Sequence, residues 1–139
     1  MDVGFTRAGF KVLWAAEKNQ AACDTYNANH NAEVAVCRQL DLRTVDFNKL
    51  RRELPGPVDC IFGGPPCQGF SQAGKMQLHD PRNGLVNVFM DAVDKLRPRS
   101  FLMENVKNLG TKALFKPILD KLTDRTREGP WVRMRVQGA

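Results

Sequence analysis

Residues 63–71 have the sequence Gly-Gly-Pro-Pro-Cys-Gln-Gly-Phe-Ser and directly follow the apolar run from Val58 to Phe62. A short β-branched and aromatic run that stops at two glycines and two prolines predicts a buried strand ending in a rigid turn. In an open α/β sheet, ligands bind beyond the carboxyl ends of the strands. Cys67 follows the two prolines of this turn and is therefore our candidate nucleophile.

The strand and turn belong to a chain of 139 residues, which is long enough for one domain with a real core. Hydrophobic residues make up 42% and charged residues 26% of the chain, as in ordinary globular proteins. The net charge of +6 mildly favours a polyanionic partner. The chain contains no apolar run of about 18 residues and no opening signal peptide, so we expect a cytoplasmic protein without a membrane segment.

The four cysteines and two histidines show no metal-ligand spacing; the cysteines are at positions 23, 37, 60 and 67, and the histidines at 30 and 79. No C-x-x-C pair occurs, so we expect no zinc or other metal site. A disulfide framework is also not expected, because nothing indicates secretion. Cys23, Cys37 and Cys60 are interpreted as small buried hydrophobic residues.

Along the chain, apolar periodicity and cap residues predict helices and strands in alternation. We expect helices over residues 2–9, 19–29, 47–54, 85–96 and 116–123, with Asn19 and Asp46 as N-terminal caps. We expect strands over residues 11–16, 33–37, 58–62, 100–103 and 131–136. The clearest helix carries one apolar stripe, formed by Leu85, Val88, Phe89, Ala92, Val93 and Leu96. Alternation with short connections predicts an α/β fold with a doubly wound, mostly parallel sheet.

Acidic residues follow three of the expected strands. Glu17, Asp41 and Glu104 would lie at the carboxyl edge of a parallel sheet. An ionised carboxylate only accepts hydrogen bonds, so an acid after one strand suits two ribose hydroxyls, and an acid after the next suits an adenine amino group. The alternative is that these acids are solvated loop residues or helix caps. That alternative is favoured for any single acid, but three at matched positions favour a nucleoside site.

Three segments in a fixed order resemble the motifs of the C5-cytosine DNA methyltransferases. They are GGPPCQGFSQAGK at residues 63–75, DPRNGL at 80–85 and FLMENVKNL at 101–109. Residues 4–30 are similar to the cofactor-binding start of that family. The resemblance covers nearly the whole chain and implies a Rossmann-like, S-adenosylmethionine-dependent methyltransferase fold.

The resemblance implies a role for each residue of the motifs around the nucleophile. Cys67 would be the thiolate that adds to C6 of cytosine, which makes C5 able to accept a methyl group from S-adenosylmethionine. Glu104 would contact N3 and the exocyclic amine of the base and supply a proton, for which it needs a raised pKa. Pro66 and Asn105 would hold the two motifs in place.

The resemblance also implies contacts to the cofactor. Glu17 would bind the ribose, Asp41 with Leu42 would bind the adenine edge, and Pro65 and Leu85 would make apolar contacts.

Double-stranded DNA is the implied partner, with the target base flipped into the pocket. The loop of residues 69–82 would close over the base. Gln68, Ser71, Lys75 and Arg82 would contact phosphates or fill the space that the base leaves. The alternative for these four residues is an ordinary solvated loop.

The chain departs from the family pattern at both ends. The strand and Gly-rich turn that cradle the cofactor would precede Met1, and the arginine motif and target-recognition region would follow residue 139. We therefore expect a partial catalytic domain with the first strand missing, whose sheet is left as two half-sheets with open inner edges. Such a chain would be poorly stable alone, or would take a strand from a complementing polypeptide.

Two other functions stay open at this stage. Some relatives of this family methylate cytosine in transfer RNA, although the QGFSQAGK segment is more similar to the DNA enzymes. The chain could also be a non-catalytic remnant of a truncated gene.

Overall fold

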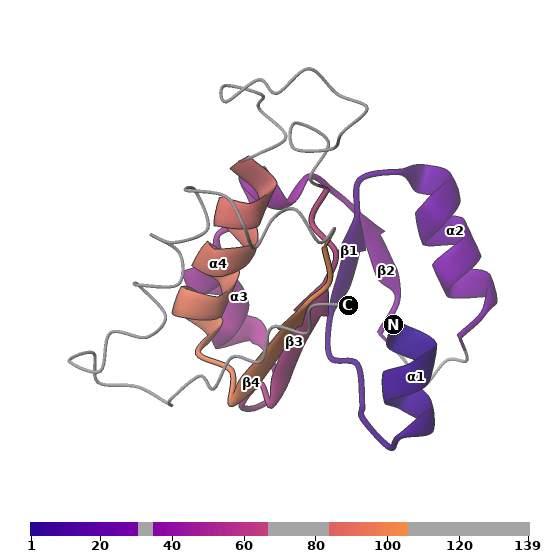
Figure 1. Ribbon diagram of the computed structural model, residues 1–139, viewed down its shortest axis with the longest axis horizontal. Coiled ribbons are helices and arrows are strands. Elements are labelled where there is room, and N and C mark those ends of the chain that lie inside the picture. Colours follow the sequence, from indigo (N-terminus) through magenta and orange to yellow (C-terminus); the bar gives the residue numbers. More distant parts are fainter. Residues whose placement is uncertain (31–34, 67–83, 106–139) are drawn as a thin grey trace. The chain divides into compact units, whose positions relative to one another are not determined.

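The computed structural model describes residues 1–30, 35–66 and 84–105 (Figure 1). The chain divides into two compact units, residues 1–56 and residues 57–139. Each unit contains a two-stranded parallel sheet in its described part, with strand orders β1-β2 and β3-β4. These short parallel sheets agree with the α/β fold expected from the sequence.

The first unit is built on β1 (Ala15–Glu17) and β2 (Cys37–Gln39), with helices before, between and after the strands. The helical elements are α1 (Asp2–Arg7), α2 (Gln20–Ala28), the 3-10 turn η1 (Leu42–Thr44) and α3 (Phe47–Glu53). Ala15 lies opposite Cys37 and Glu17 lies opposite Gln39. A hydrogen bond of 3.0 Å from the Leu40 N–H to the Glu17 carbonyl continues the ladder past the last strand pair.

Helix α2 is capped by Asn19, whose side-chain oxygen accepts a hydrogen bond of 3.2 Å from the Ala22 N–H. Near its other end, the Asn27 amide bonds to the backbone of Cys37 on both sides. Its oxygen accepts from the Cys37 N–H at 2.8 Å, and its nitrogen donates to the Cys37 carbonyl at 3.5 Å. Asn27 therefore joins α2 to the first residue of β2 through the peptide groups that the strand leaves free.

The second unit is built on β3 (Cys60–Gly63), α4 (Gly84–Leu96) and β4 (Ser100–Met103). Cys60 lies opposite Ser100 and Gly63 lies opposite Met103. A further backbone hydrogen bond of 3.0 Å, from the Glu104 N–H to the Gly63 carbonyl, extends this ladder by one residue. The ladder therefore fixes the backbone of Glu104 beside the start of the Gly-Gly-Pro-Pro turn.

Helix α4 buries an apolar face made of Val86, Phe89, Ala92, Val93 and Leu96. The Phe89 ring meets the Phe101 ring of β4 edge to face, with 6.1 Å between ring centroids. The same ring leaves little room at Gly63, where a Cβ atom would lie 3.2 Å from Phe89 Cε2.

Four predicted helices and one predicted strand are confirmed to within a few residues: the helices over 2–9, 19–29, 47–54 and 85–96, and the strand over 100–103. The predicted apolar stripe of α4 needs one correction. Val86 is buried, whereas Leu85 and Val88 are half-buried. The helix is rotated slightly from the predicted face because Val86, Phe89, Val93 and Leu96 also follow helical spacing.

The other described strands start later than predicted. The strand expected over 11–16 is observed at 15–17, and that over 58–62 at 60–63. Of the strand expected over 33–37, residues 33–34 lie outside the described ranges, and the observed strand covers 37–39. A strand extends only where a partner supplies a ladder, and the register pairs β1 with β2 over three residues. Single backbone hydrogen bonds still join the segments before the strands, from the Ala35 N–H to the Val12 carbonyl at 3.3 Å and from the Arg99 N–H to the Val58 carbonyl at 3.2 Å. The apolar residues there contact the partner segment without forming a full strand ladder. The predicted helix 116–123 and strand 131–136 lie outside the described residues.

Candidate functional site

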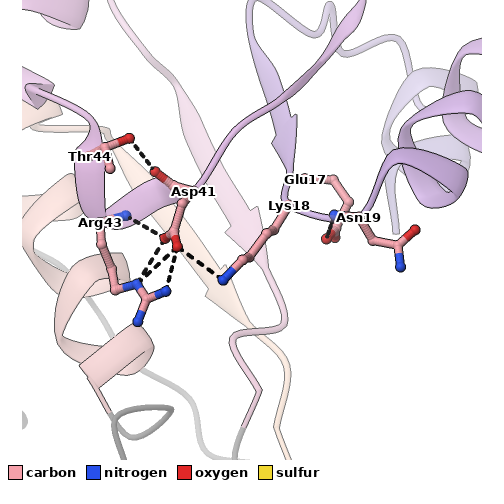
Figure 2. A network of polar contacts seen from close by, with 6 residues as sticks. All are labelled: Glu17, Lys18, Asn19, Asp41, Arg43 and Thr44. Atoms are coloured by element: carbon pink, nitrogen blue, oxygen red, sulfur yellow. Dashed lines mark hydrogen bonds and ion pairs between the residues drawn. The ribbon is translucent and has the colours of Figure 1, made fainter.

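Two acidic residues lie at one edge of the β1–β2 sheet. Glu17 ends β1, and Asp41 lies two residues beyond the end of β2. The strands are parallel, so both acids follow the carboxyl ends. Lys18 joins the two strand ends, because its ammonium lies 3.2 Å from Asp41 Oδ2 (Figure 2). The structure thus brings together the two acids predicted to hold a nucleoside.

The Asp41 carboxylate is occupied by donors from its own neighbourhood. Arg43 Nε lies 2.9 Å from Oδ1 and 3.1 Å from Oδ2, and Arg43 Nη2 also bonds to Oδ2. The Arg43 N–H donates to Oδ1 at 3.1 Å, and the Thr44 hydroxyl donates to the Asp41 carbonyl at 2.8 Å (Figure 2). The hydrogen bonds from Arg43 hold the pKa of Asp41 well below its usual range. Asp41 is therefore an ionised acceptor at neutral pH.

Glu17 is exposed, and it organises the turn between β1 and α2. Its Oε1 accepts a hydrogen bond of 3.0 Å from the Asn19 N–H. Within the described part of the chain, Oε2 has no hydrogen-bond partner, so it can accept from a ligand hydroxyl. Leu42 begins η1 and is half-buried beside Asp41 in the sequence. The donors and acceptors at this edge fit the adenosine part of S-adenosylmethionine, provided that one donor to Asp41 gives way to the adenine amino group.

The second unit brings the residues before Cys67 next to the residues after β4. Asn105 Nδ2 donates a hydrogen bond of 2.8 Å to the Pro65 carbonyl. Pro65 is half-buried and Pro66 is exposed. Because Pro66 has no N–H, the Pro65 carbonyl is the polar group that can orient this peptide link. Asn105 thus fixes the backbone two residues ahead of Cys67.

Glu104 lies against the same turn. A Cβ atom at Gly64 would lie 3.3 Å from Glu104 Oε2 and 3.7 Å from the Glu104 carbonyl oxygen. The carboxylate therefore sits close to the Gly64 backbone, where a side chain would crowd it. Glu104 is exposed, and Leu85 is half-buried in the first turn of α4.

The predicted site residues that the structure describes fall into two groups, one in each unit. Glu17, Asp41 and Leu42 form the group in the first unit. Pro65, Pro66, Leu85, Glu104 and Asn105 are in the second unit, where contacts join Pro65 to Asn105 and bring Gly64 close to Glu104. Cys67, Gln68, Ser71, Lys75 and Arg82 lie outside the described residues.

Three residues that contribute to these groups were not predicted from the sequence. Lys18 and Arg43 hold Asp41, and Gly64 leaves space for Glu104. The position of Arg43, two residues after an acid that begins a turn, was an available signal for a local ion pair. Nothing in the sequence indicates that Lys18 reaches from one strand end to the other.

The described residues offer neither a cluster of metal ligands nor a membrane-spanning helix. No group of three or more histidines, cysteines and acids in these ranges could hold a metal ion. None of the helices in the described ranges is long and apolar enough to cross a membrane.

Comparisons with known proteins identify relatives along most of the chain. The sequence profile of the family described as C-5 cytosine-specific DNA methylase matches residues 1–125. Type II methyltransferase M.AgeI from Thalassovita gelatinovora is 44% identical over 76% of this chain and 25% of its own length. Type II methyltransferase M1.HphI from Haemophilus parahaemolyticus is 45% identical over 99% of this chain and 37% of its own length. The chain therefore spans well under half the length of these relatives.

Two solved structures have a similar fold. A putative DNA modification methyltransferase encoded within a prophage of E. coli aligns with a TM-score of 0.68 and 33% identity, over 88% of this chain and 33% of that one. DNMT2 from Spodoptera frugiperda aligns with a TM-score of 0.67 and 24% identity, over 88% of this chain and 37% of that one, which shows likeness of fold alone. The Rossmann-like methyltransferase fold expected from the sequence is thereby confirmed.

Proposed function

The chain belongs to the C-5 cytosine-specific DNA methylase family, and we propose that it forms part of an enzyme that methylates C5 of cytosine in double-stranded DNA through a covalent adduct with Cys67. The observation that carries the proposal is the hydrogen bond from Asn105 to the Pro65 carbonyl. This contact brings the turn that leads into Cys67 beside the segment that contains Glu104. A nucleophile and a proton donor on these two segments would reach the same base.

In the proposed reaction the Cys67 thiolate adds to C6 of the cytosine ring, and the C5–C6 double bond opens. Glu104 donates a proton to N3, so that electron density collects at C5 instead of remaining on the ring nitrogen. S-adenosylmethionine supplies the electrophilic methyl group that C5 attacks. The demethylated cofactor, S-adenosylhomocysteine, is the leaving group. Loss of the C5 proton to a base then restores the double bond and expels Cys67 as a thiolate, while N3 returns its proton to Glu104. The enzyme is regenerated, and 5-methylcytosine remains.

We infer that the nucleoside part of S-adenosylmethionine is held by Glu17 and Asp41, with Leu42 beside the adenine. The free Oε2 of Glu17 suits ribose hydroxyls, and the low pKa of Asp41 keeps it an acceptor for the adenine amino group. Lys18 is largely exposed and bonds to Asp41 through a single contact, so it is the donor most easily replaced.

The DNA contacts in this proposal come from the segment that follows Cys67. Gln68 and Ser71 offer uncharged polar groups, whereas Lys75 and Arg82 offer cations for phosphates. The net charge of +6 supports a polyanionic partner. We propose further that the full activity requires a complementing polypeptide, because this chain spans well under half the length of the relatives it matches.

The decisive experiment measures transfer of a labelled methyl group from S-adenosylmethionine to duplex DNA. The chain is assayed alone and together with a polypeptide that supplies the remaining segments of a relative. We expect transfer that Cys67→Ser abolishes and that Cys60→Ser, the matched control, leaves within about twofold. Transfer to tRNA but not to DNA would overturn the proposed substrate. Equal transfer by wild type and Cys67→Ser would overturn the covalent mechanism.

A further inference from the structure

Two free cysteines meet in the interior of the first unit. Cys23 is on α2 and Cys37 begins β2, 14 residues later, and their Sγ atoms are 3.2 Å apart. Cys23 is 1% exposed and Cys37 is 7% exposed. The sulfurs are therefore in direct contact with each other and almost entirely shielded from water.

The hydrogen bonds show how the two thiols are arranged. The Cys23 S–H donates to the Glu17 carbonyl at 3.4 Å. The single proton of the Cys23 thiol lies in this hydrogen bond to Glu17. The proton between the two sulfurs therefore belongs to Cys37. Burial and the hydrogen bond to Cys23 raise the pKa of the Cys37 thiol well above its usual range. The Cys37 thiol is accordingly neutral at physiological pH.

The backbone around the pair is held from both sides. The Asn27 amide accepts from the Cys37 N–H and donates to the Cys37 carbonyl, so the start of β2 is fixed to the same helix that carries Cys23. A contact of 3.2 Å between fixed positions gives each sulfur one preferred thiol partner. Cys60 is in the other unit, on β3.

We propose that Cys23 and Cys37 are a redox modification site, which forms an intramolecular disulfide when the protein meets a peroxide. The first thiol reduces the peroxide to water and becomes a sulfenic acid. The second sulfur then displaces the hydroxyl group, which leaves as water with the second thiol proton. Two thiols thus lose two protons and two electrons to one peroxide, which yields two water molecules. Since the thiolate is the reactive form and the pKa of the Cys37 thiol is raised, attack by Cys37 is slower at neutral pH than at alkaline pH.

The disulfide would link α2 covalently to β2 next to the Glu17 carbonyl, which the Cys23 sulfur contacts. It would replace a hydrogen-bonded contact with a bond that closes a loop of about 15 residues, and such a crosslink stabilises the folded state. This modification does not depend on the proposed methyl transfer, since both sulfurs and their partners belong to the first unit alone.

The test exploits the protease sites of the chain. There is no Lys or Arg between Lys18 and Arg38, so trypsin leaves both cysteines in one peptide, residues 19–38. Cleavage after Glu33 then separates Cys23 from Cys37 unless a disulfide joins them. The full chain is treated with hydrogen peroxide while folded, and a second sample is treated in guanidinium. All remaining thiols are alkylated before digestion and mass spectrometry.

We expect the folded sample to yield joined fragments 19–33 and 34–38, lighter by two hydrogen atoms, as its main disulfide. In guanidinium the same linkage should fall to a fraction of a scrambled mixture. Cys37→Ser should lose it, and Cys60→Ser should keep it. The oxidised wild type should also unfold at a higher temperature than the reduced protein, and dithiothreitol should reverse that shift. An equal share of the Cys23–Cys37 linkage in folded and unfolded samples, or none in the folded one, would overturn the proposal.

Discussion

In the first unit an amide and two thiols hold α2 against β2, whereas in the second unit an aromatic ring and an apolar face hold α4 to its sheet. Asn27 bonds to both peptide groups of Cys37, and Phe89 packs on Gly63 and Phe101. Both arrangements attach a helix to a two-stranded parallel sheet. Because the contacts differ chemically, pH and oxidants should weaken the attachment of the helix to a different extent in each unit.

Apolar attachment depends on the shape of the side chains, and it responds weakly to pH or oxidants. Polar attachment depends on the protonation and oxidation states of a few groups. The first unit should therefore be the part of the chain that senses solution conditions. The second unit, which carries Glu104 and the turn toward Cys67, should keep its geometry until its packing is broken. Five substitutions test this contrast, in order of expected effect.

The largest effect is expected from Phe89→Ala. Removing a buried aromatic ring leaves a cavity between α4 and the strands, and such changes lower the free energy of unfolding by about 3–5 kcal/mol. Urea titration of the chain followed by circular dichroism measures the change. Asn87→Ala, on the exposed side of the same helix, should shift the free energy by less than about 0.5 kcal/mol. Similar losses for the two variants would show that the apolar face does not hold this unit.

Asn27→Ala tests the polar attachment. It leaves the N–H of buried Cys37 without its partner, and an unsatisfied buried donor lowers the free energy of unfolding by about 1–3 kcal/mol. Asn48→Ala removes an exposed amide from α3 and should be near neutral. Hydrogen exchange locates the effect, since the Cys37 amide should lose protection while α4 keeps its own. Loss of protection in α4 instead would contradict the separation of the two attachments.

Gly63→Ala and Gly64→Ala compare two close approaches in the second unit. The new Cβ at Gly63 would meet the Phe89 ring at 3.2 Å, and overpacking of a fixed ring should lower the free energy of unfolding by about 1 kcal/mol. At Gly64 it would meet the end of the flexible Glu104 side chain at 3.3 Å, so the cost in stability should be smaller. Gly64→Ala should instead reduce methyl transfer in the complemented assay. Urea unfolding and methyl transfer are measured on both variants. A smaller loss of stability in Gly63→Ala than in Gly64→Ala would contradict this prediction.

The smallest effect on stability is expected from Arg43→Ala, which should raise the pKa of Asp41 toward the usual range of an aspartate, as seen by NMR titration of the carboxyl carbon. The folded-state pKa of Asp41 now lies below its unfolded value. Its contribution to stability is therefore present above the unfolded pKa and is lost as the pH falls through the folded one. Arg43 is 45% exposed, so salt should weaken the effect. An unchanged pKa of Asp41 in the variant would mean that Lys18 and the backbone N–H of residue 43 are enough to keep that pKa low.

Local signals in the sequence accounted for much of the fold. Asn19 and Asp46 cap α2 and α3 as predicted, since capping involves residues two or three apart. Residues 100–103 form a strand with the predicted bounds. The starts of β1, β2 and β3 were predicted too early, because the extent of a strand depends on the partner that it meets.

The candidate site was predictable only where it depends on the order of elements along the chain. The positions of Glu17 and Asp41 after two strands were readable from the order of elements. The ion pair from Lys18 to Asp41 and the contact between Cys23 and Cys37 depend on how two strand ends and a helix meet in space. Cys23 and Cys37 are buried as predicted, whereas Cys60, also predicted to be buried, is half-buried. The contact between Cys23 and Cys37 was not predicted. The role of Cys67 stays a prediction.

The registers of the two sheets also bear on the order in which the chain folds. Ala15 pairs with Cys37 across 22 residues, whereas Cys60 pairs with Ser100 across 40. Closing the longer loop costs about 0.5 kcal/mol more in chain entropy. During synthesis, the partners of the first sheet also leave the ribosome well before Ser100 is added. We therefore expect the first sheet to form earliest, while the strand that leads to Cys67 waits for β4.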